Sequence, residues 1–214
     1  MTYALIEVEA TAKKAARGAG YSWGMAEEAA KATRWLCASG VDGVAALAAV
    51  LACADGVNLS TMAPSSLAGD WQATSGTMCP LMAGATLSDA TTYWSETTKH
   101  IADVVAPILL VPFAASSARQ LGMTVTIEAN NVHAVTDGSV VSIASRDETA
   151  LFAKAKIVSV RTGGQLAHPY PAQIRANPTE ADWATLNRFA HRTYAPDTEA
   201  SRLKGAGAGL SDND

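Results

Sequence analysis

Side chains that can exchange protons gather near the carboxyl end of the chain. The members are His168, Tyr170, His191, Arg192, Tyr194 and Arg202. A histidine and a tyrosine can pass a proton, and an arginine can hold a carboxylate through two parallel hydrogen bonds. These residue types predict chemistry on a small anionic substrate, with His168, His191 and Tyr170 as catalytic candidates. The alternative is that they are surface residues without a role, because one sequence does not show that they converge.

Two glycine-rich stretches, each preceded by cations, suggest how an anion could be held. They are "RGAG" at 17–20 and "RLKGAGAG" at 202–209. Glycine lets consecutive backbone amides turn outward and cradle a carboxylate or phosphate. A glycine after a helix is also a common left-handed cap, and a glycine-rich tail can be disordered. Neither stretch matches the glycine motifs of nucleotide sites. The predicted anion-binding set is Arg17, Gly18, Gly20, Arg202, Gly205 and Gly207.

Cysteine and histidine positions predict no metal site and no cofactor. The three cysteines, Cys37, Cys53 and Cys79, show no CxxC spacing, and the four histidines form no HxH or HxxxH pair. Free thiols in a reducing compartment fit best. Cys79 would be a nucleophile if His100 or His133 lay near it in space, and the alternative is a buried thiol that packs as a small apolar group.

Composition bounds the class of protein. The chain has 214 residues, of which 49% are hydrophobic and 17% charged, and alanine is unusually frequent. We expect a single domain, 1–214, that hides further surface in a homo-oligomer, because few charged groups remain to cover its outside.

Charge and hydropathy patterns exclude several partners. The net charge is −4 and the basic residues are scattered, so no nucleic-acid surface is predicted. Glu7 and Glu9 are incompatible with a signal peptide, and the most apolar window, 101–115, is too short to cross a bilayer. We therefore expect a cytoplasmic protein without membrane contact.

The elements that must position these residues are predicted as α+β. Residues 1–55 show three helical patterns, with Ser22 and Asp42 as N-caps of the second and third. Residues 104–162 predict a mostly antiparallel sheet, in which 104–113 is a buried strand at an edge or interrupted by its prolines. Residues 177–204 predict C-terminal helices, the first capped by Asn177, followed by a glycine-rich tail.

Two stretches resemble a known family. They are "EVEATAKKAARGAGYSWGMAEEAAKATRWL" and the ending "TEASRLKGAGAGLSDND". Both are similar to an uncharacterised bacterial family of unknown function, with a KAARGAGxSWGxAEEA signature, a GAGAGLxDND ending and about this whole length. The resemblance implies an ordered tail and brings no activity, cofactor or catalytic residue.

Together these patterns predict a cytosolic enzyme or binding protein for a small anionic metabolite, a carboxylate or a phosphate. The alternative is a non-enzymatic oligomeric accessory or structural protein whose alanine-rich helices form subunit contacts. An ordered tail folded over a cleft would favour the first, and a tail lying across a neighbouring subunit would favour the second.

Overall fold

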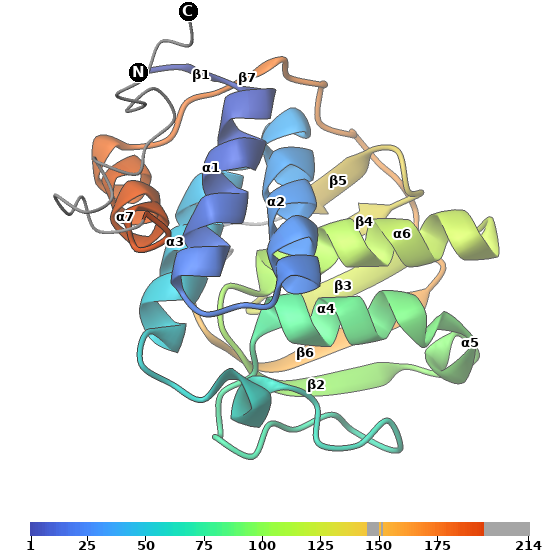
Figure 1. Cartoon of the computed structure of the whole chain (residues 1–214). Helices are drawn as coiled ribbons and strands as arrows, with labels where there is room; N and C mark the ends of the chain where they lie inside the picture. Colours follow the sequence, from blue (N-terminus) through green and yellow to red (C-terminus); the bar gives the residue numbers. More distant parts are fainter. Residues whose placement is uncertain (145–149, 151, 195–214) are drawn as a thin grey trace, which may run out of the picture.

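The chain folds as α+β, as predicted, with a helical layer beside an antiparallel sheet (Figure 1). The computed structural model describes residues 1–144, 150 and 152–194. The helices of the helical layer are α1 (Leu5–Gly18), α2 (Trp23–Ala38), α3 (Gly43–Ala54) and α7 (Glu180–His191). Helices α4 (Pro80–Asp89) and α6 (Val111–Leu121) lie side by side over one face of the sheet.

Local capping chemistry explains where the N-terminal helices begin. The Ser22 hydroxyl accepts a hydrogen bond from the Met25 amide at 3.3 Å, and Asp42 Oδ1 accepts one from the Ala45 amide at 3.0 Å. Each bond satisfies one of the backbone donors that a helix start leaves unpaired. Both predicted caps are confirmed.

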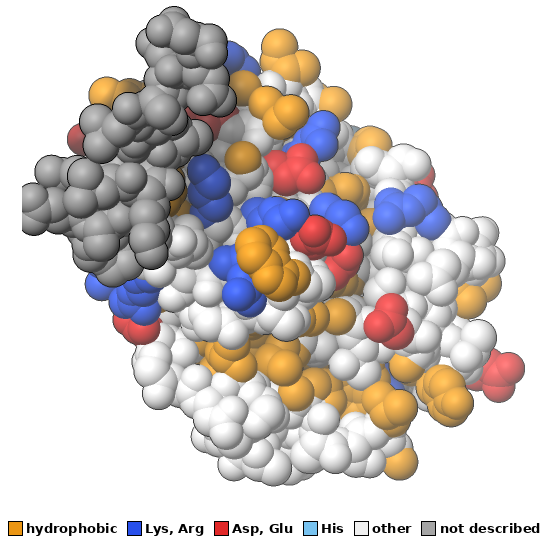
Figure 2. Space-filling model, in the orientation of Figure 1, with side chains coloured by type: hydrophobic (Ala, Val, Ile, Leu, Met, Phe, Trp, Pro, Cys, Tyr) orange, Lys and Arg blue, Asp and Glu red, His pale blue; other side chains and the backbone are white. Residues whose placement is uncertain are grey.

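Helix α3 is apolar on nearly every side and is buried between its neighbours. Its sequence, GVAALAAVLACA, contacts α1, α2 and α7. Alanine side chains are short, so these helices can pack close together. The outer face of α1 and α2 is instead crossed by ion pairs, Lys13–Glu27 at 2.7 Å and Arg34–Glu9 at 2.8 Å, which Figure 2 shows as interleaved blue and red.

The main sheet is antiparallel throughout, with the strand order β2-β6-β3-β4-β5. Its strands are β2 (Lys99–Val104), β3 (Val125–Ala129), β4 (Val132–Thr136), β5 (Val141–Ala144) and β6 (Ala155–Thr162). Asn130 and Asn131 join β3 to β4 with φ of 49° and 61°, the left-handed pair that a two-residue hairpin requires. Gly138, with φ of 99°, lies in the predicted turn between β4 and β5.

The predicted strand over 104–113 is wrong. Strand β2 ends at Val104, a short 3-10 helix η2 (Pro107–Leu110) follows, and α6 begins at Val111. Pro107 and Pro112 lie in the first turns of η2 and α6, where a missing amide hydrogen costs nothing. A short apolar run is compatible with both a buried strand and a buried helix. Periodicity alone therefore does not assign residues 104–113 correctly.

Residues 56–100 show no clear sequence pattern. They form the 3-10 helix η1 (Leu59–Met62), then α4 and the short α5 (Thr91–Trp94). The segment between η1 and α4 covers the outer edge of β2, where Trp71 and Met78 make parallel bridges to Ile101 and Val104. The bridges occupy backbone groups that an edge strand would otherwise expose.

The segment before α7 and α7 itself pack against the N-terminal residues of the chain. Strand β7 (Arg175–Ala176) pairs antiparallel with β1 (Tyr3–Ala4), and the Tyr3 and Trp183 rings stack with centroids 3.8 Å apart. The N-cap of α7 is Thr179, whose hydroxyl accepts from the Asp182 amide at 3.1 Å. The predicted cap Asn177 is therefore wrong by two residues, because Thr179 has the extended backbone of a cap directly before the helix.

In the described ranges 1–144, 150 and 152–194, no helix has both the length and the hydropathy needed to cross a membrane.

Helices α1 and α7 pack in close backbone contact at Gly18. A Cβ atom added there would lie 1.8 Å from the Phe189 carbonyl oxygen, whereas one added at Gly24 would meet nothing within 4 Å. Backbone cannot yield as a flexible side chain can, so Gly18 is required by this helix contact.

Replacing Gly18 by alanine should therefore force α7 away from α1. We expect Gly18→Ala to lower the free energy of unfolding by about 1–3 kcal/mol. The matched control Gly24→Ala, at an open position near the start of α2, should be neutral or stabilising by up to about 1 kcal/mol. Denaturant titrations of both variants test this, and equal stability of the two would contradict the contact.

Candidate ligand-binding pocket

The glycine corner at 17–20 ends a helix and holds no free amides for an anion. The amides of Ala19, Gly20 and Tyr21 donate to the carbonyls at positions 15, 17 and 16, at 2.9, 3.0 and 3.1 Å. This is the bonding of a helix C-terminus. The anion-binding role predicted for Gly18 and Gly20 is thus corrected, since their backbone serves helix termination and the contact with α7.

Arg17 is engaged locally at the same corner. Its guanidinium lies over the Trp23 ring, 4.4 Å from the centroid, and donates to the Tyr21 carbonyl oxygen. Lys14 lies 5.8 Å from the Tyr194 ring centre. These contacts make the corner cationic and aromatic. The other half of the predicted anion set, Arg202, Gly205 and Gly207, lies outside the described residues.

The three predicted catalytic residues do not come together. His191 ends α7 beside Tyr194, with ring centroids 5.4 Å apart, at the end of the helical layer where Gly18 meets α7. Tyr170 lies beside Gly40, after the other end of the 16-residue α2. That length corresponds to roughly 24 Å. His168 is exposed, two residues from Tyr170. A direct proton exchange between His191 and Tyr170 is therefore excluded by distance.

Cys79 is not paired with a histidine. Its Sγ atom lies 3.2 Å from the Tyr21 hydroxyl, and both residues are buried. Burial raises the pKa of the Cys79 thiol and that of the Tyr21 hydroxyl. His100 instead contacts Ser159 Oγ at 3.0 Å, and His133 faces Glu128 at 3.5 Å. The alternative, a buried thiol that packs as a small side chain, describes Cys79 correctly.

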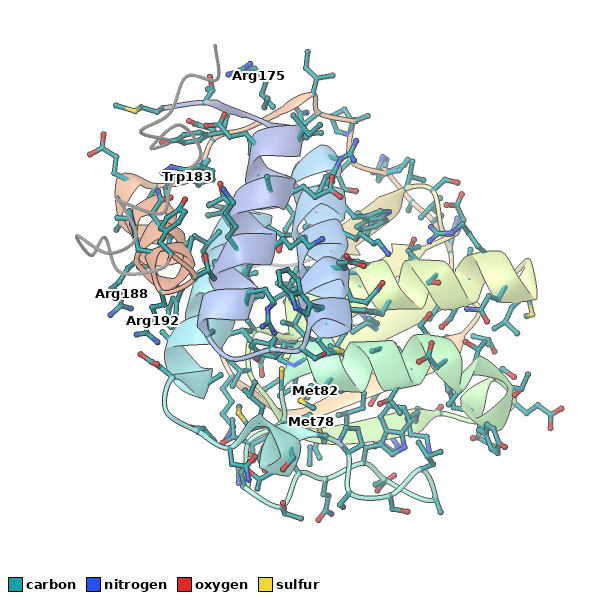
Figure 3. The ribbon with its side chains drawn as sticks, viewed as in Figure 1. Met78, Met82, Arg175, Trp183, Arg188 and Arg192 are labelled. Atoms are coloured by element: carbon teal, nitrogen blue, oxygen red, sulfur yellow. The ribbon has the colours of Figure 1, made fainter. Side chains whose placement is uncertain are left out.

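A pocket of about 250 Å³ opens where α2 ends and the segment before α7 passes. Its walls come from the end of α2, the turn into α3, and the chain on either side of β7. Figure 3 shows Arg175 at the end of the molecule where α1 begins. The lining residues are Cys37, Gly40, Val41, Asp42, Gln173, Arg175, Ala176 and Asn177. Tyr170 borders this wall, because it packs 3.8 Å from the position of a Gly40 Cβ atom.

The Asp42 carboxylate lies in the pocket wall and is partly desolvated. Burial raises its pKa above the ordinary value of 3.8, the Ala45 amide opposes that shift, and the negative charge of Asp182 adds to it. The capping bond to α3 therefore holds a carboxylate where its charge is disfavoured.

Arg175 brings the opposite charge and is held in place by the N-terminal segment. Its Nε atom donates to Thr2 Oγ1 at 3.2 Å, and its Nη2 atom donates to the Thr2 carbonyl oxygen at 2.9 Å. Nη1 has no hydrogen-bond partner among the described residues. An oriented guanidinium with unused donors at a pocket is suited to a carboxylate or phosphate.

Cys37 contributes a neutral thiol. Burial raises its pKa to about 11, although the backbone amides of Gly43 and Val44 act in the opposite direction. At neutral pH the group is therefore protonated and is not a nucleophilic thiolate. In the described part of the chain, no cluster of three or more His, Cys, Asp or Glu side chains could hold a metal ion.

Sequence reasoning missed this pocket because its two halves lie far apart along the chain. The sequence predicts Asp42 only as a helix cap, and Arg175 lies two residues before Asn177, the residue predicted to cap α7. Neither belongs to a motif. The signal that sequence did contain was a polar carboxyl-terminal cluster, of which Tyr170 reaches the pocket wall.

Comparison with known proteins identifies one family model. Residues 3–79 match the family described as "Protein of unknown function (DUF3726)". The predicted resemblance to an uncharacterised family is confirmed for these residues, and the C-terminal ending that it included lies outside the match. No curated protein and no solved structure matches the chain. The α2–α3 wall of the pocket lies within the matched residues, and the wall at 173–177 lies beyond them.

The position of Asp42 predicts how stability depends on pH. A carboxyl group with a raised native pKa binds its proton more tightly when folded, so the unfolding free energy falls as pH rises from 3.8 through the raised value. Asp42→Asn keeps an oxygen acceptor for the Ala45 amide and removes the charge. The stability of Asp42→Asn relative to the wild type should therefore increase as the pH rises from acidic to neutral.

Asp42→Ala is the matched comparison, because it loses both the charge and the cap. It should be less stable than Asp42→Asn by about 1 kcal/mol. Denaturant unfolding of the three proteins across the acidic range measures both effects. A disadvantage of Asp42→Asn that grows toward neutral pH would show that the carboxylate is stabilised and not desolvated.

Proposed function

We propose that the chain is a cytosolic protein that binds a small metabolite through a carboxylate or phosphate group in the pocket beside Arg175. The observation that carries this proposal is the guanidinium of Arg175, oriented by Thr2 and lining a pocket of about 250 Å³. The ligand class is the one predicted from sequence, and the binding residues differ from those predicted.

The donors that Arg175 retains suit an anion. Two of its nitrogen atoms already donate to Thr2, which fixes the plane of the guanidinium. Nη1 and the second hydrogen of Nη2 form the outer edge of the group, and this edge can donate two parallel hydrogen bonds to one carboxylate. Little rotational freedom remains to be lost on binding.

The rest of the lining favours a ligand of mixed polarity. Gln173 and Asn177 supply neutral amide groups, and Val41 and Ala176 supply apolar surface. A short aliphatic acid suits this combination, because its carboxylate can bind Arg175 and its carbon chain can contact the apolar surface.

Thermal unfolding in the presence of anions tests the proposal. Pentanoate and inorganic phosphate should each be titrated against the wild type, Arg175→Gln and the control Arg161→Gln, whose guanidinium instead pairs with Glu128 at 3.1 Å on the sheet. A ligand at a hundred times its dissociation constant stabilises by about 2.7 kcal/mol. We expect such stabilisation in the wild type and the control and its loss in Arg175→Gln. Equal responses in all three proteins would contradict binding at Arg175.

We also infer self-association through the end of the molecule where β1 pairs with β7. Three apolar side chains beside this pairing are exposed, Met1 at 79%, Ile6 at 74% and Ile174 at 85%. Exposed apolar side chains gathered near one end of a protein are typical of contact surfaces.

Light scattering coupled to size-exclusion chromatography measures this association. The wild type should elute as a dimer or larger species, and Ile174→Glu should shift it toward the monomer. Ile157→Glu, at a 53% exposed position on β6, is the matched control and should not change the mass. A monomeric wild type would refute the association.

A further inference from the structure

The pocket is lined by two opposite charges that do not pair with each other. Asp42 and Arg175 both line it, yet no ion pair between them is present, and neither forms one with any other described residue. Arg175 donates to neutral oxygen atoms of Thr2, and Asp42 accepts from a backbone amide. Each charge thus lacks a counterion within the described protein.

A simple anion leaves one of these charges uncompensated. A carboxylate bound at Arg175 enters a pocket that already contains the negative charge of Asp42, and like charges at close range oppose binding. The charge of Asp182 also acts on Asp42, which increases the negative character of that side. A positive group at Asp42 would remove this repulsion.

We propose that the ligand is a short zwitterion, an amino acid or a longer amino carboxylic acid, whose carboxylate binds Arg175 and whose ammonium binds Asp42. This inference rests on the function proposed above and assigns its substrate class. The apolar groups Val41 and Ala176 and the neutral thiol of Cys37 lie in the same lining and can contact the ligand's aliphatic carbons.

The desolvation of Asp42 is consistent with such a ligand. Burial disfavours the charged carboxylate in the empty pocket and raises its pKa, and an ammonium group in contact with it would favour the charged form. A protein retains an unpaired, partly buried carboxylate at a cost to its stability, and such costs are typical of binding sites.

Four five-carbon compounds separate the contributions of the two charges. Pentanoate has the carboxylate alone and pentylamine the ammonium alone, whereas norvaline and 5-aminopentanoate have both, at short and long spacing. Isothermal titration of the wild type with each compound gives the dissociation constants. We expect one of the two zwitterions to bind at least about tenfold more tightly than either singly charged compound.

Two variants, each of which removes one charge, test which residue binds each end of the ligand. Asp42→Asn should abolish the advantage of the zwitterion over pentanoate, and Arg175→Gln should abolish its advantage over pentylamine. Asp89→Asn, an exposed position at the end of α4, is the control and should leave all four constants unchanged.

Each outcome has a distinct meaning. If pentanoate binds as tightly as both zwitterions and depends on Arg175, the zwitterion inference fails while the carboxylate function stands. If pentylamine binds as tightly as the zwitterions, or if none of the four binds at millimolar concentration, both proposals are overturned. If a zwitterion binds best but its advantage survives Asp42→Asn, the assignment of the ammonium to Asp42 is wrong.

Discussion

The pocket depends on the attachment of the segment from residue 173 to 177 to the N-terminal helices. Three sets of contacts hold it there: the pairing of β7 with β1, the hydrogen bonds from Arg175 to Thr2, and a bond of 2.7 Å from the Gln173 amide to the Ala38 carbonyl. The stacked rings of Tyr3 and Trp183 continue the same attachment into α7. Without it, Asp42 and Arg175 would lie on unrelated surfaces.

This attachment also explains why the pocket has opposite charges in it. The Asp42 carboxylate is fixed by its role as the cap of α3, and the Arg175 guanidinium is fixed by Thr2, so neither side chain needs the other for its orientation. Both are therefore preorganised without forming an internal ion pair. Preorganised charges lower the entropic cost of binding a ligand that matches them.

Much of the helical architecture was predictable from local sequence. Ser22 and Asp42 are predictable as caps because their side chains satisfy backbone donors only three residues away, within a short window of sequence. The apolar run at 104–113 was misassigned because a buried helix and a buried strand share the same composition. The exact cap of α7 was misplaced because Asn177 and Thr179 are both competent caps, and backbone conformation decided between them.

The candidate site was less predictable than the helices, because a short window of sequence does not contain residues that lie far apart along the chain. By itself, the sequence determined the α+β class, the starts of α2 and α3, the β4–β5 turn and the types of residue available for anion binding, because these follow from periodicity and from contacts between near neighbours. Only the tertiary structure decided that the amides at Gly20 and Tyr21 are used in ending α1, that His191 and Tyr170 are far apart, and that Asp42 and Arg175 line one pocket. These are relations between residues separated by up to 133 positions (175 − 42), and they are set by the packing of whole helices and strands.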